Sequence, residues 1–206
     1  MCHDCFKLIT KINKPFCNCC GKPISIDIDE DLKCIKCMHK KSSFDKMRFL
    51  FKFDEKSKKI IHSLKYMDKT SISKFVTRLI YFRYSEEIQD YDAIIPVPMH
   101  KIKRLMRFYN QSELLAKDLE KFTSKPVISN VLYKSKMTPP QVSLRGKERI
   151  NNVKNSFSIK NCELIYNKNI ILIDDVITTG ATIENCAKLL KNAGAKSILV
   201  LGIAHT

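Results

Sequence analysis

The stretch NIILIDDVITTGAT, residues 169–182, limits most strongly what this chain can fold into. An apolar run leads into two adjacent carboxylates, Asp174 and Asp175, and a Thr- and Gly-containing loop then opens a helical pattern. A buried strand, a loop and a helix in this order form the repeating unit of parallel α/β sheets. We expect the strand to end at the carboxylates. Because two neighbouring like charges repel each other, the pair is easier to explain if a ligand occupies the site.

Strands and helices alternate through the rest of the chain. Short apolar strands are expected in DAIIPVP (92–98), PVISNVLYKS (126–135) and SILVLGIA (197–204). Amphipathic helices are expected in NQSELLAKDLEKF (110–122), with Ser112 as a cap, and in TIENCAKLLKNAG (182–194), with Ile183, Ala187 and Leu190 on one face. This alternation predicts an α/β fold with a doubly wound, mainly parallel sheet.

The chemistry of residues 174–182 indicates a phosphorylated sugar. Ligands of such sheets bind outside the carboxyl ends of the strands, where the start of a helix offers N–H groups to an anion. Three threonines add hydroxyl donors, and Gly180 allows a phosphate to approach the backbone closely. The carboxylates are acceptors, suited to a sugar diol or to bound Mg²⁺. A ribose 5-phosphate satisfies both halves of this pattern.

Two other interpretations of the same stretch are weaker. The acid-ended strand of an ATPase requires a partner loop of the form G-x-x-x-x-G-K-[ST], and the sequence has none. A purely structural strand would not explain two acids followed by TTGAT.

Seven of the nine cysteines precede residue 38, and six of these seven form three C-x-x-C pairs. Each C-x-x-C turn directs two sulfurs at one point, so two turns complete a tetrahedral Zn²⁺ shell. The best tetrad has the spacing C-x2-C-x13-C-x2-C and consists of Cys17, Cys20, Cys34 and Cys37. Cys2 and Cys5 could replace one pair or form a second half-site. Four thiolates leave no open position for catalysis, so a structural zinc finger is expected.

A net charge of +16 makes a polyanionic partner plausible, although a solvated Lys-rich surface would give the same number. Residues 40–83 hold 13 Lys or Arg against 4 Asp or Glu. The aromatic side chains among them suit base stacking or, equally, a hydrophobic core; they are Phe49, Phe51, Phe53 and Tyr66. No apolar run reaches the roughly 18 residues of a membrane helix, and no signal peptide begins the sequence, so a cytoplasmic protein with reduced thiols is expected.

Several segments resemble known sequences. ILIDDVITTGAT resembles the PRPP motif of the type I phosphoribosyltransferases. Four further segments resemble, in order along the chain, those of the ComF family of the ComFC type: CNCCGKPI with CIKC, IHSLKYMDK, PVPMHKIKRLMRFYNQSELLA and TPPQVSLRGKERINNVKNSF. The resemblance implies a type I phosphoribosyltransferase-like domain over residues 43–206 and a small four-cysteine zinc finger over residues 1–42.

The resemblance also implies roles for individual residues. Asp174 and Asp175 would hold the ribose hydroxyls of 5-phosphoribosyl 1-pyrophosphate (PRPP). The residues that would wrap its 5′-phosphate are Thr178, Thr179, Gly180, Ala181 and Thr182. Candidates for contacting the pyrophosphate, with Mg²⁺, or DNA are Lys65, His100, Lys101, Lys103, Arg104 and Arg107, although 101–107 could also be a solvated basic turn. Gln141, Arg145, Lys147 and Arg149 could lie on a loop that closes over the ligand.

The function implied by the family is natural transformation, in which single-stranded DNA is brought into the cytoplasm. Such a role would involve a DNA-uptake helicase or membrane channel as partner, with the protein in the cytoplasm or at the inner face of the membrane and not inserted in it. An alternative function is an active phosphoribosyltransferase acting on a nucleobase or a related acceptor. Release of pyrophosphate from PRPP would distinguish the two functions.

Overall fold

The computed structural model describes residues 6, 9–24, 32–66, 70–100, 102, 105, 109–135 and 156–206, without the side chains of residues 65, 66 and 70. Four strands form one sheet in the order β1-β6-β5-β2, and every neighbouring pair is parallel. Their bounds are β1 Lys46–Lys52, β2 Ala93–Pro96, β5 Asn169–Ile177 and β6 Ser197–His205. The doubly wound parallel sheet predicted from the sequence is confirmed.

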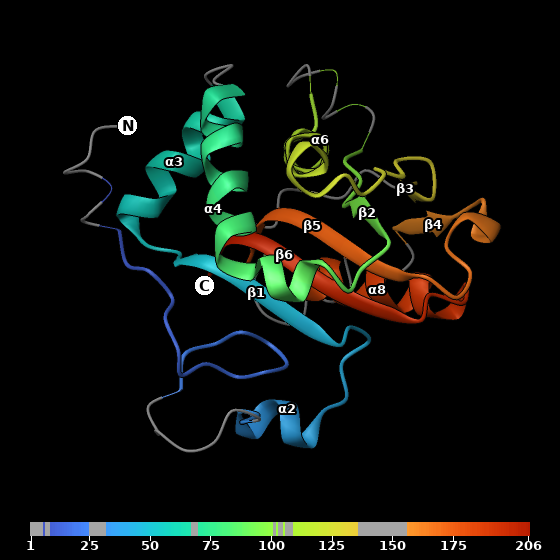
Figure 1. Ribbon diagram of the computed structural model, residues 1–206, viewed down its shortest axis with the longest axis horizontal. Helices are drawn as coiled ribbons and strands as arrows, with labels where there is room; N and C mark the ends of the chain where they lie inside the picture. Colours follow the sequence, from blue (N-terminus) through green and yellow to red (C-terminus); the bar gives the residue numbers. More distant parts are fainter. Residues whose placement is uncertain are drawn as a thin grey trace.

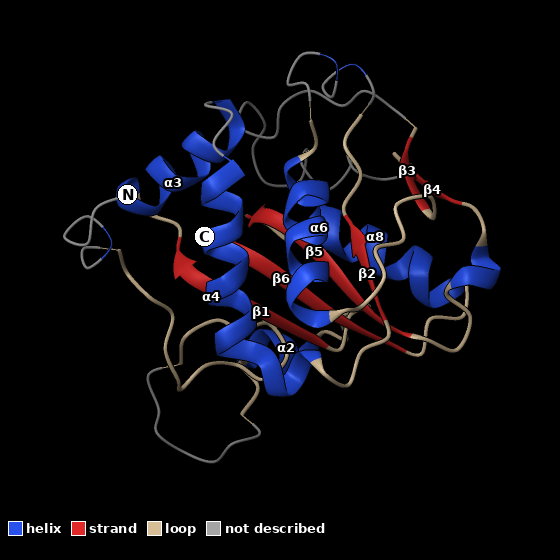
Figure 2. Ribbon diagram, turned by 45° about the horizontal axis from the view of Figure 1, so that its top comes forward, coloured by secondary structure: helices blue, strands red, loops and turns tan. Residues whose placement is uncertain are grey.

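Helices cover both faces of this sheet. The helices on one face are α3 Glu55–Tyr66, α4 Thr70–Ile88 and α6 Gln111–Thr123, which stand above the sheet in Figure 1 and in front of it in Figure 2. Helix α8 Ala181–Asn192 packs on the other face through Ile183, Cys186, Ala187 and Leu190. The expected apolar face of α8 is therefore correct.

Between α6 and β5 the chain first runs along the outer edge of β2 and then returns to the interior of the sheet. Val127, after α6, forms a parallel bridge with Ile94 of β2, and the amide of Ile128 donates to the Ile94 carbonyl over 2.9 Å. Two short strands then form an antiparallel pair, β3 Leu132–Lys134 and β4 Phe157–Ile159. The single strand expected over 126–135 is thus divided between a bridge and β3. A 3-10 helix, η2 Cys162–Leu164, precedes β5.

The cysteine-containing segment lies below β1 in Figure 1, together with the short helix α2 Ile35–His39. Phe16 and Cys19 pack against the hydrophobic cluster on the α8 side of the sheet. This segment is therefore anchored on the edge of the sheet formed by β1.

Two of the aromatic side chains considered for base stacking belong to the core. Phe49 is 1% and Phe51 2% exposed, because both faces of edge strand β1 are covered. Phe53 is half-buried, and the Tyr66 side chain lies outside the described residues. The alternative interpretation, that these rings form the core, is correct for Phe49 and Phe51.

Among the described helices, none is both long and apolar enough to cross a bilayer.

Candidate functional site

The neighbouring strands β2 and β5 lead into helices on opposite faces of the sheet. From β2 the chain enters α6 on one face, and from β5 it enters α8 on the other. Open α/β sheets bind ligands at such a point, where the direction of winding reverses outside the carboxyl ends of the strands. Asn110 supports this arrangement, because its Nδ2 donates to the Val97 carbonyl over 3.0 Å just beyond β2.

Helix α6 begins differently from the expectation. The capping residue is Asn110, whose side chain accepts from the amide of Ser112, and Ser112 lies inside the first turn. The Ser112 hydroxyl is therefore available to reach across the switch point, and Oγ donates to Asp174 Oδ1 over 2.8 Å. Ser112 was expected only as a cap, so its contact with the acidic pair was missed.

Strand β5 does not end at the carboxylates, as expected, but continues through them to Ile177. Its partner β2 ends at Pro96, opposite Ile173, whereas β6 still pairs with Asp174, Val176 and Ile177. Within the described part of the chain, one edge of β5 therefore has no strand partner beyond Ile173. Local carboxylates accept from the backbone there: Asp174 Oδ1 accepts from the amide of Asp175 over 2.9 Å, and Asp175 Oδ1 from the amide of Val176 over 2.7 Å.

The alternation of side chains also changes at the acidic pair. Ile171 and Ile173 belong to the cluster under α3, α4 and α6, whereas Leu172 belongs to the cluster under α8. Regular alternation would place Val176 on the α8 side, yet it packs on the other side, and Ile177 takes the α8 side. The backbone thus departs from a regular strand at the two aspartates.

A shallow hollow lies where β5 passes into α8. It is lined by Asp174, Val176, Ile177, Thr178, Gly180, Ala181, Thr182 and Ile183. Five of the seven residues expected to bind PRPP thus share one hollow. Asp175 and Thr179 are not among its lining residues, and Thr179 is exposed.

Gly180 shapes the loop at this hollow. It has φ 75° and ψ 0°, a left-handed conformation that suits glycine, and it is the residue that caps α8. Apart from the glycine and its two chain neighbours, no heavy atom of the described residues lies within 4 Å of the place that a Cβ would occupy, so the missing side chain leaves open space above the helix start. The first turn of a helix has amides without intrahelical partners and a positive dipole end. The arrangement can accept an anion.

The acidic residue in the first turn of α8 is half-buried and makes a separate contact. Glu184 Oε1 accepts from both the amide and the hydroxyl of Ser43, over 2.9 and 2.7 Å. This pair of hydrogen bonds also ties the segment that precedes β1 to α8.

A second cluster consists of the four sulfurs expected to bind zinc. The Sγ atoms of Cys17, Cys20, Cys34 and Cys37 all lie within 4.8 Å of one another, and those of Cys20 and Cys34 are 3.7 Å apart. A tetrahedral Zn²⁺ site with Zn–S bonds of about 2.3 Å has sulfurs about 3.8 Å apart. The donor set therefore fits a structural metal ion such as zinc. Cys2 and Cys5 lie outside the described residues.

The protonation of these thiols reflects their crowding. Burial opposes ionisation of Cys17, but the amides of Cys20 and Cys34, at 3.4 and 3.2 Å from Sγ, outweigh it and lower its pKa to about 7. Burial raises the pKa of Cys20 to about 12 and also raises the pKa of Cys37. Metal coordination deprotonates a thiol outright, so a bound cation would reverse the two upward shifts.

Glycine is also required in the first knuckle. Gly21 has φ 68°, and its amide donates to the Cys17 carbonyl over 2.8 Å. A Cβ at this position would lie 2.4 Å from the Met47 carbonyl oxygen, so the knuckle lies directly against β1.

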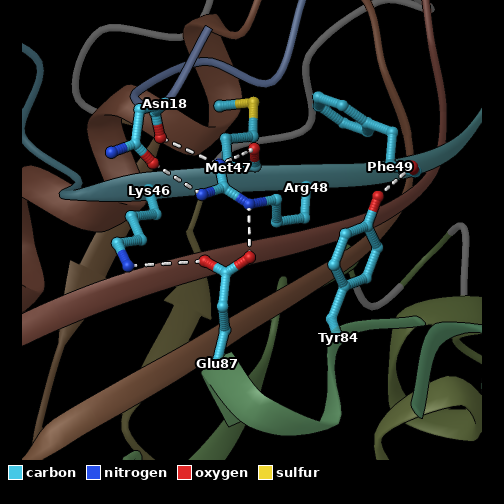
Figure 3. Close-up of polar contacts among 7 residues, drawn as sticks. All are labelled: Asn18, Lys46, Met47, Arg48, Phe49, Tyr84 and Glu87. Atoms are coloured by element: carbon cyan, nitrogen blue, oxygen red, sulfur yellow. Dashed lines mark hydrogen bonds and ion pairs between the residues drawn. The ribbon is translucent and has the colours of Figure 1, made fainter. Parts of the chain in front are cut away.

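A buried arginine links this knuckle to the helical layer (Figure 3). Arg48 on β1 is 3% exposed, and its guanidinium donates to the carbonyl and side-chain oxygens of Asn18 over 2.8 and 2.9 Å. Its Nε donates to Glu87 Oε1 over 2.7 Å, at the end of α4. Asn18 lies between the first two cysteines of the tetrad, so one side chain connects the metal-binding segment, the sheet and α4.

The expected pyrophosphate contacts lie mostly outside the described residues. This applies to Lys101, Lys103, Arg104 and Arg107, to the Lys65 side chain, and to the candidate loop residues Gln141, Arg145, Lys147 and Arg149. His100 is described, half-buried beyond β2, and its Nδ1 accepts from the amide of Ile102 over 3.3 Å.

Known proteins are similar to this chain over nearly all of its length. The model of the phosphoribosyl transferase domain matches residues 115–205. Competence protein F of Haemophilus influenzae is 32% identical over 213 residues, which cover 100% of this chain and 90% of that protein. The DNA utilization protein YhgH of Escherichia coli K12 is 27% identical over 212 residues, with the same coverage. Competence protein ComFC of Bacillus subtilis is 26% identical, covering 94% of this chain and 79% of that protein. With the parallel sheet, these similarities show the expected type I phosphoribosyltransferase fold.

Proposed function

The chain belongs to the ComF family, and from this premise we propose that it is a competence protein that helps single-stranded DNA enter the cytoplasm during natural transformation. Relatives named as competence proteins and as a DNA utilization protein support this role. We further propose that residues 174–182 bind PRPP, and that the finger (1–42) and the phosphoribosyltransferase-like part (43–206) are separate domains.

The observation that carries the PRPP proposal is the place of the acidic pair. Asp174, held by Ser112, lies at the winding switch point and lines the same hollow as the loop that opens α8. A sugar diol requires acceptors, and a 5′-phosphate requires N–H and hydroxyl donors at a helix start. The hollow contains both a carboxylate acceptor and the donors at the start of α8, so one ligand could bind to both.

We assign the roles within this site as follows. Asp174 and Asp175 accept from the ribose hydroxyls, and residues 178–182 surround the 5′-phosphate. Basic side chains of the segment from His100 to Arg107, with Lys65, contact the pyrophosphate. Mg²⁺ would reach the site with PRPP and neutralise the charge of its pyrophosphate. The four-cysteine cluster holds zinc and stabilises the fold of the amino-terminal segment.

Calorimetry with PRPP and Mg²⁺ tests the site. Asp174→Ala and Thr179→Ala should each weaken binding by about 1.5–3 kcal/mol, because each removes a hydrogen bond to a charged or buried group. Wild-type affinity in both variants would exclude the ribose-phosphate interpretation. Since Thr179 is exposed in this structure, retention of affinity by Thr179→Ala alone would remove only that residue from the site.

A second function, active phosphoribosyl transfer, is favoured by the match to the phosphoribosyl transferase domain. An enzyme that transfers a phosphoribosyl group must stabilise an oxocarbenium-like C1 and a leaving pyrophosphate. It does so mostly by the placement of charges and by the exclusion of water. Incubation of the protein with PRPP and candidate nucleobases, followed by a pyrophosphate assay, distinguishes the two. Stoichiometric binding without pyrophosphate release supports a sensor or anchor site, whereas turnover supports the enzyme.

Single-strand binding is the third part of the proposal, and a net charge of +16 supports it. Each phosphate neutralised on a single strand contributes about −0.7 to the slope of log affinity against log salt, so about four to six contacts predict a slope near −3 to −4. Replacing Lys103, Arg104 and Arg107 together should make the slope shallower. If the affinity does not change with salt, the positive charge serves only to solvate the surface.

A DNA-uptake helicase or membrane channel is the proposed partner, at the inner face of the membrane.

A further inference from the structure

The outward face of α4 carries two exposed aromatic rings with an arginine between them. Phe75, Arg78 and Phe82, here called the α4 stripe, follow each other at spacings of three and four residues, which places them on one side of the helix. Phe75 is 40% and Phe82 65% exposed, and Arg78 is also exposed. The Arg78 guanidinium lies 5.4 Å from the centre of the Phe82 ring. The stripe is therefore an open surface of rings and positive charge.

Aromatic contacts extend the stripe on both sides. Phe6 lies edge-on to Phe75 with ring centres 5.4 Å apart, and the Lys11 ammonium lies 4.9 Å from the Phe6 ring. On the α6 side, Tyr81 stacks on Phe122 with ring centres 5.8 Å apart, and Phe122 is 37% exposed. Segments from three parts of the chain thus contribute to one surface.

The charge of α4 favours a polyanion as the occupant. Between Thr70 and Ser85 the helix has no Asp or Glu, whereas it has Lys74, Arg78 and Arg83. Arg83 is engaged with the Ile12 carbonyl, but Lys74 and Arg78 are exposed. Acidic residues begin only at Glu86, beyond the stripe. A partner that combines flat apolar rings with phosphates would use both features of this face.

We propose that the α4 stripe is the surface on which the bases of a single-stranded nucleic acid stack. The inference rests on the proposed single-strand binding and gives it a location. The core rings Phe49 and Phe51 cannot stack with bases, since they are buried. Phe75 and Phe82 offer ring faces to bases, and Arg78 and Lys74 contact the adjoining phosphates. Such stacking tolerates any sequence, because every base has a π face.

Two oligonucleotides of equal charge test the location: a 20-residue oligo-dT and an abasic 20-mer. Wild-type protein should bind oligo-dT more tightly. Phe75→Ala and Phe82→Ala should each weaken oligo-dT binding by about 5- to 160-fold, the range for loss of one stacked base. Their affinity for the abasic strand should stay the same, because the phosphate contacts remain. Arg78→Gln should weaken binding of both strands.

Control variants separate stacking from general damage. Tyr166→Ala removes a ring that is 73% exposed outside the stripe, beside Gly194, and should leave both affinities unchanged. Phe82→Leu keeps apolar bulk and folding but removes the π face, so it should behave like Phe82→Ala.

The outcomes are distinguishable. If wild-type protein binds neither strand, the proposed single-strand binding fails and the stripe proposal fails with it. If it binds, and the Phe75 and Phe82 variants keep the preference for oligo-dT, only the stripe proposal is overturned. Loss of self-association in these variants, with unchanged DNA affinity, would instead identify the face as an interface between copies of the chain.

Discussion

Ser112 Oγ donates to Asp174 Oδ1 over 2.8 Å and joins the first turn of α6 to the acidic end of β5. The two residues are 62 positions apart in the sequence. Ser112 lies on a helix that covers the sheet, and Asp174 lies on a strand of the sheet itself. Asp174 Oδ1 also accepts from the amide of Asp175. Two donors on Oδ1 therefore orient this carboxylate, which suits the proposed contact with a ribose diol.

Ser112→Ala should weaken PRPP binding by about 1 kcal/mol, roughly fivefold, because the carboxylate of Asp174 loses a donor that orients it. Ser197→Ala is a matched control, since Ser197 Oγ donates over the same 2.8 Å to Asn169 Oδ1 at the opposite ends of β5 and β6. Both variants should lose similar stability in thermal unfolding. Calorimetry that finds equal PRPP affinities for the two variants would show that the Ser112 contact is only structural.

Zinc should bind with a stoichiometry of one at the four-cysteine cluster. Cys17→Ser and Cys34→Ser should lose the metal, because serine does not supply a thiolate. Cys19→Ser is the control: Cys19 lies within the same knuckle but packs toward the α8-side cluster, outside the tetrad. Metal analysis of purified variants measures the effect. Retention of zinc in Cys17→Ser combined with its loss in Cys2→Ser or Cys5→Ser would show that the assigned tetrad is wrong.

Arg48 and Lys46 offer a comparison of two cations that share Glu87. Arg48→Met should destabilise the fold by about 3–5 kcal/mol, because it leaves Glu87 Oε1 and the Asn18 oxygens without their buried donor. Lys46 is 43% exposed, and its Nζ lies 3.5 Å from Glu87 Oε2, so Lys46→Met should cost less than about 1 kcal/mol. Denaturant unfolding of zinc-loaded protein measures both. Similar losses in the two variants would contradict the linking role of Arg48.

The local features of the two sites could be predicted from the sequence. Paired C-x-x-C turns indicate a metal-binding tetrad through their spacing, and Ile183, Ala187 and Leu190 repeat at the helical period. The expectation for the strand end was wrong because composition changes at Asp174, whereas strand pairing with β6 continues to Ile177. Hydrogen bonding by the backbone does not depend on the polarity of the side chain.

Features that depend on tertiary contacts could not be predicted. An arginine in a basic stretch indicates a solvated cation, but Arg48 is buried because Asn18 and Glu87, both distant in sequence, satisfy its donors. Phe49 and Phe75 belong to the same basic region. One is buried and the other exposed because edge strand β1 is covered on both faces, whereas α4 is covered on one side only.

His205 should make the protein less stable in mild acid. Burial, followed by the charge of Lys22, lowers its pKa from 6.5 to about 4, and its ring lies 4.7 Å from that of Phe49. Above about pH 6.5 the imidazole is neutral in both folded and unfolded chains, so its titration does not change the free energy of unfolding there. Below that pH the unfolded chain binds the proton more readily, and stability falls as pH decreases toward about 4. Because the side chain is partly exposed, the loss should be on the order of 1–2 kcal/mol.

His205→Gln, which cannot take up this proton, should reduce the difference in unfolding free energy between pH 7 and pH 5. Release of the proposed zinc in acid would destabilise every variant alike, because protons compete for the thiolates, so the comparison is made between variants at equal pH. His39→Gln is the control, since His39 is exposed on α2 and should keep the wild-type dependence. If His205→Gln and His39→Gln lose the same free energy between pH 7 and pH 5, the acid sensitivity arises elsewhere than at His205.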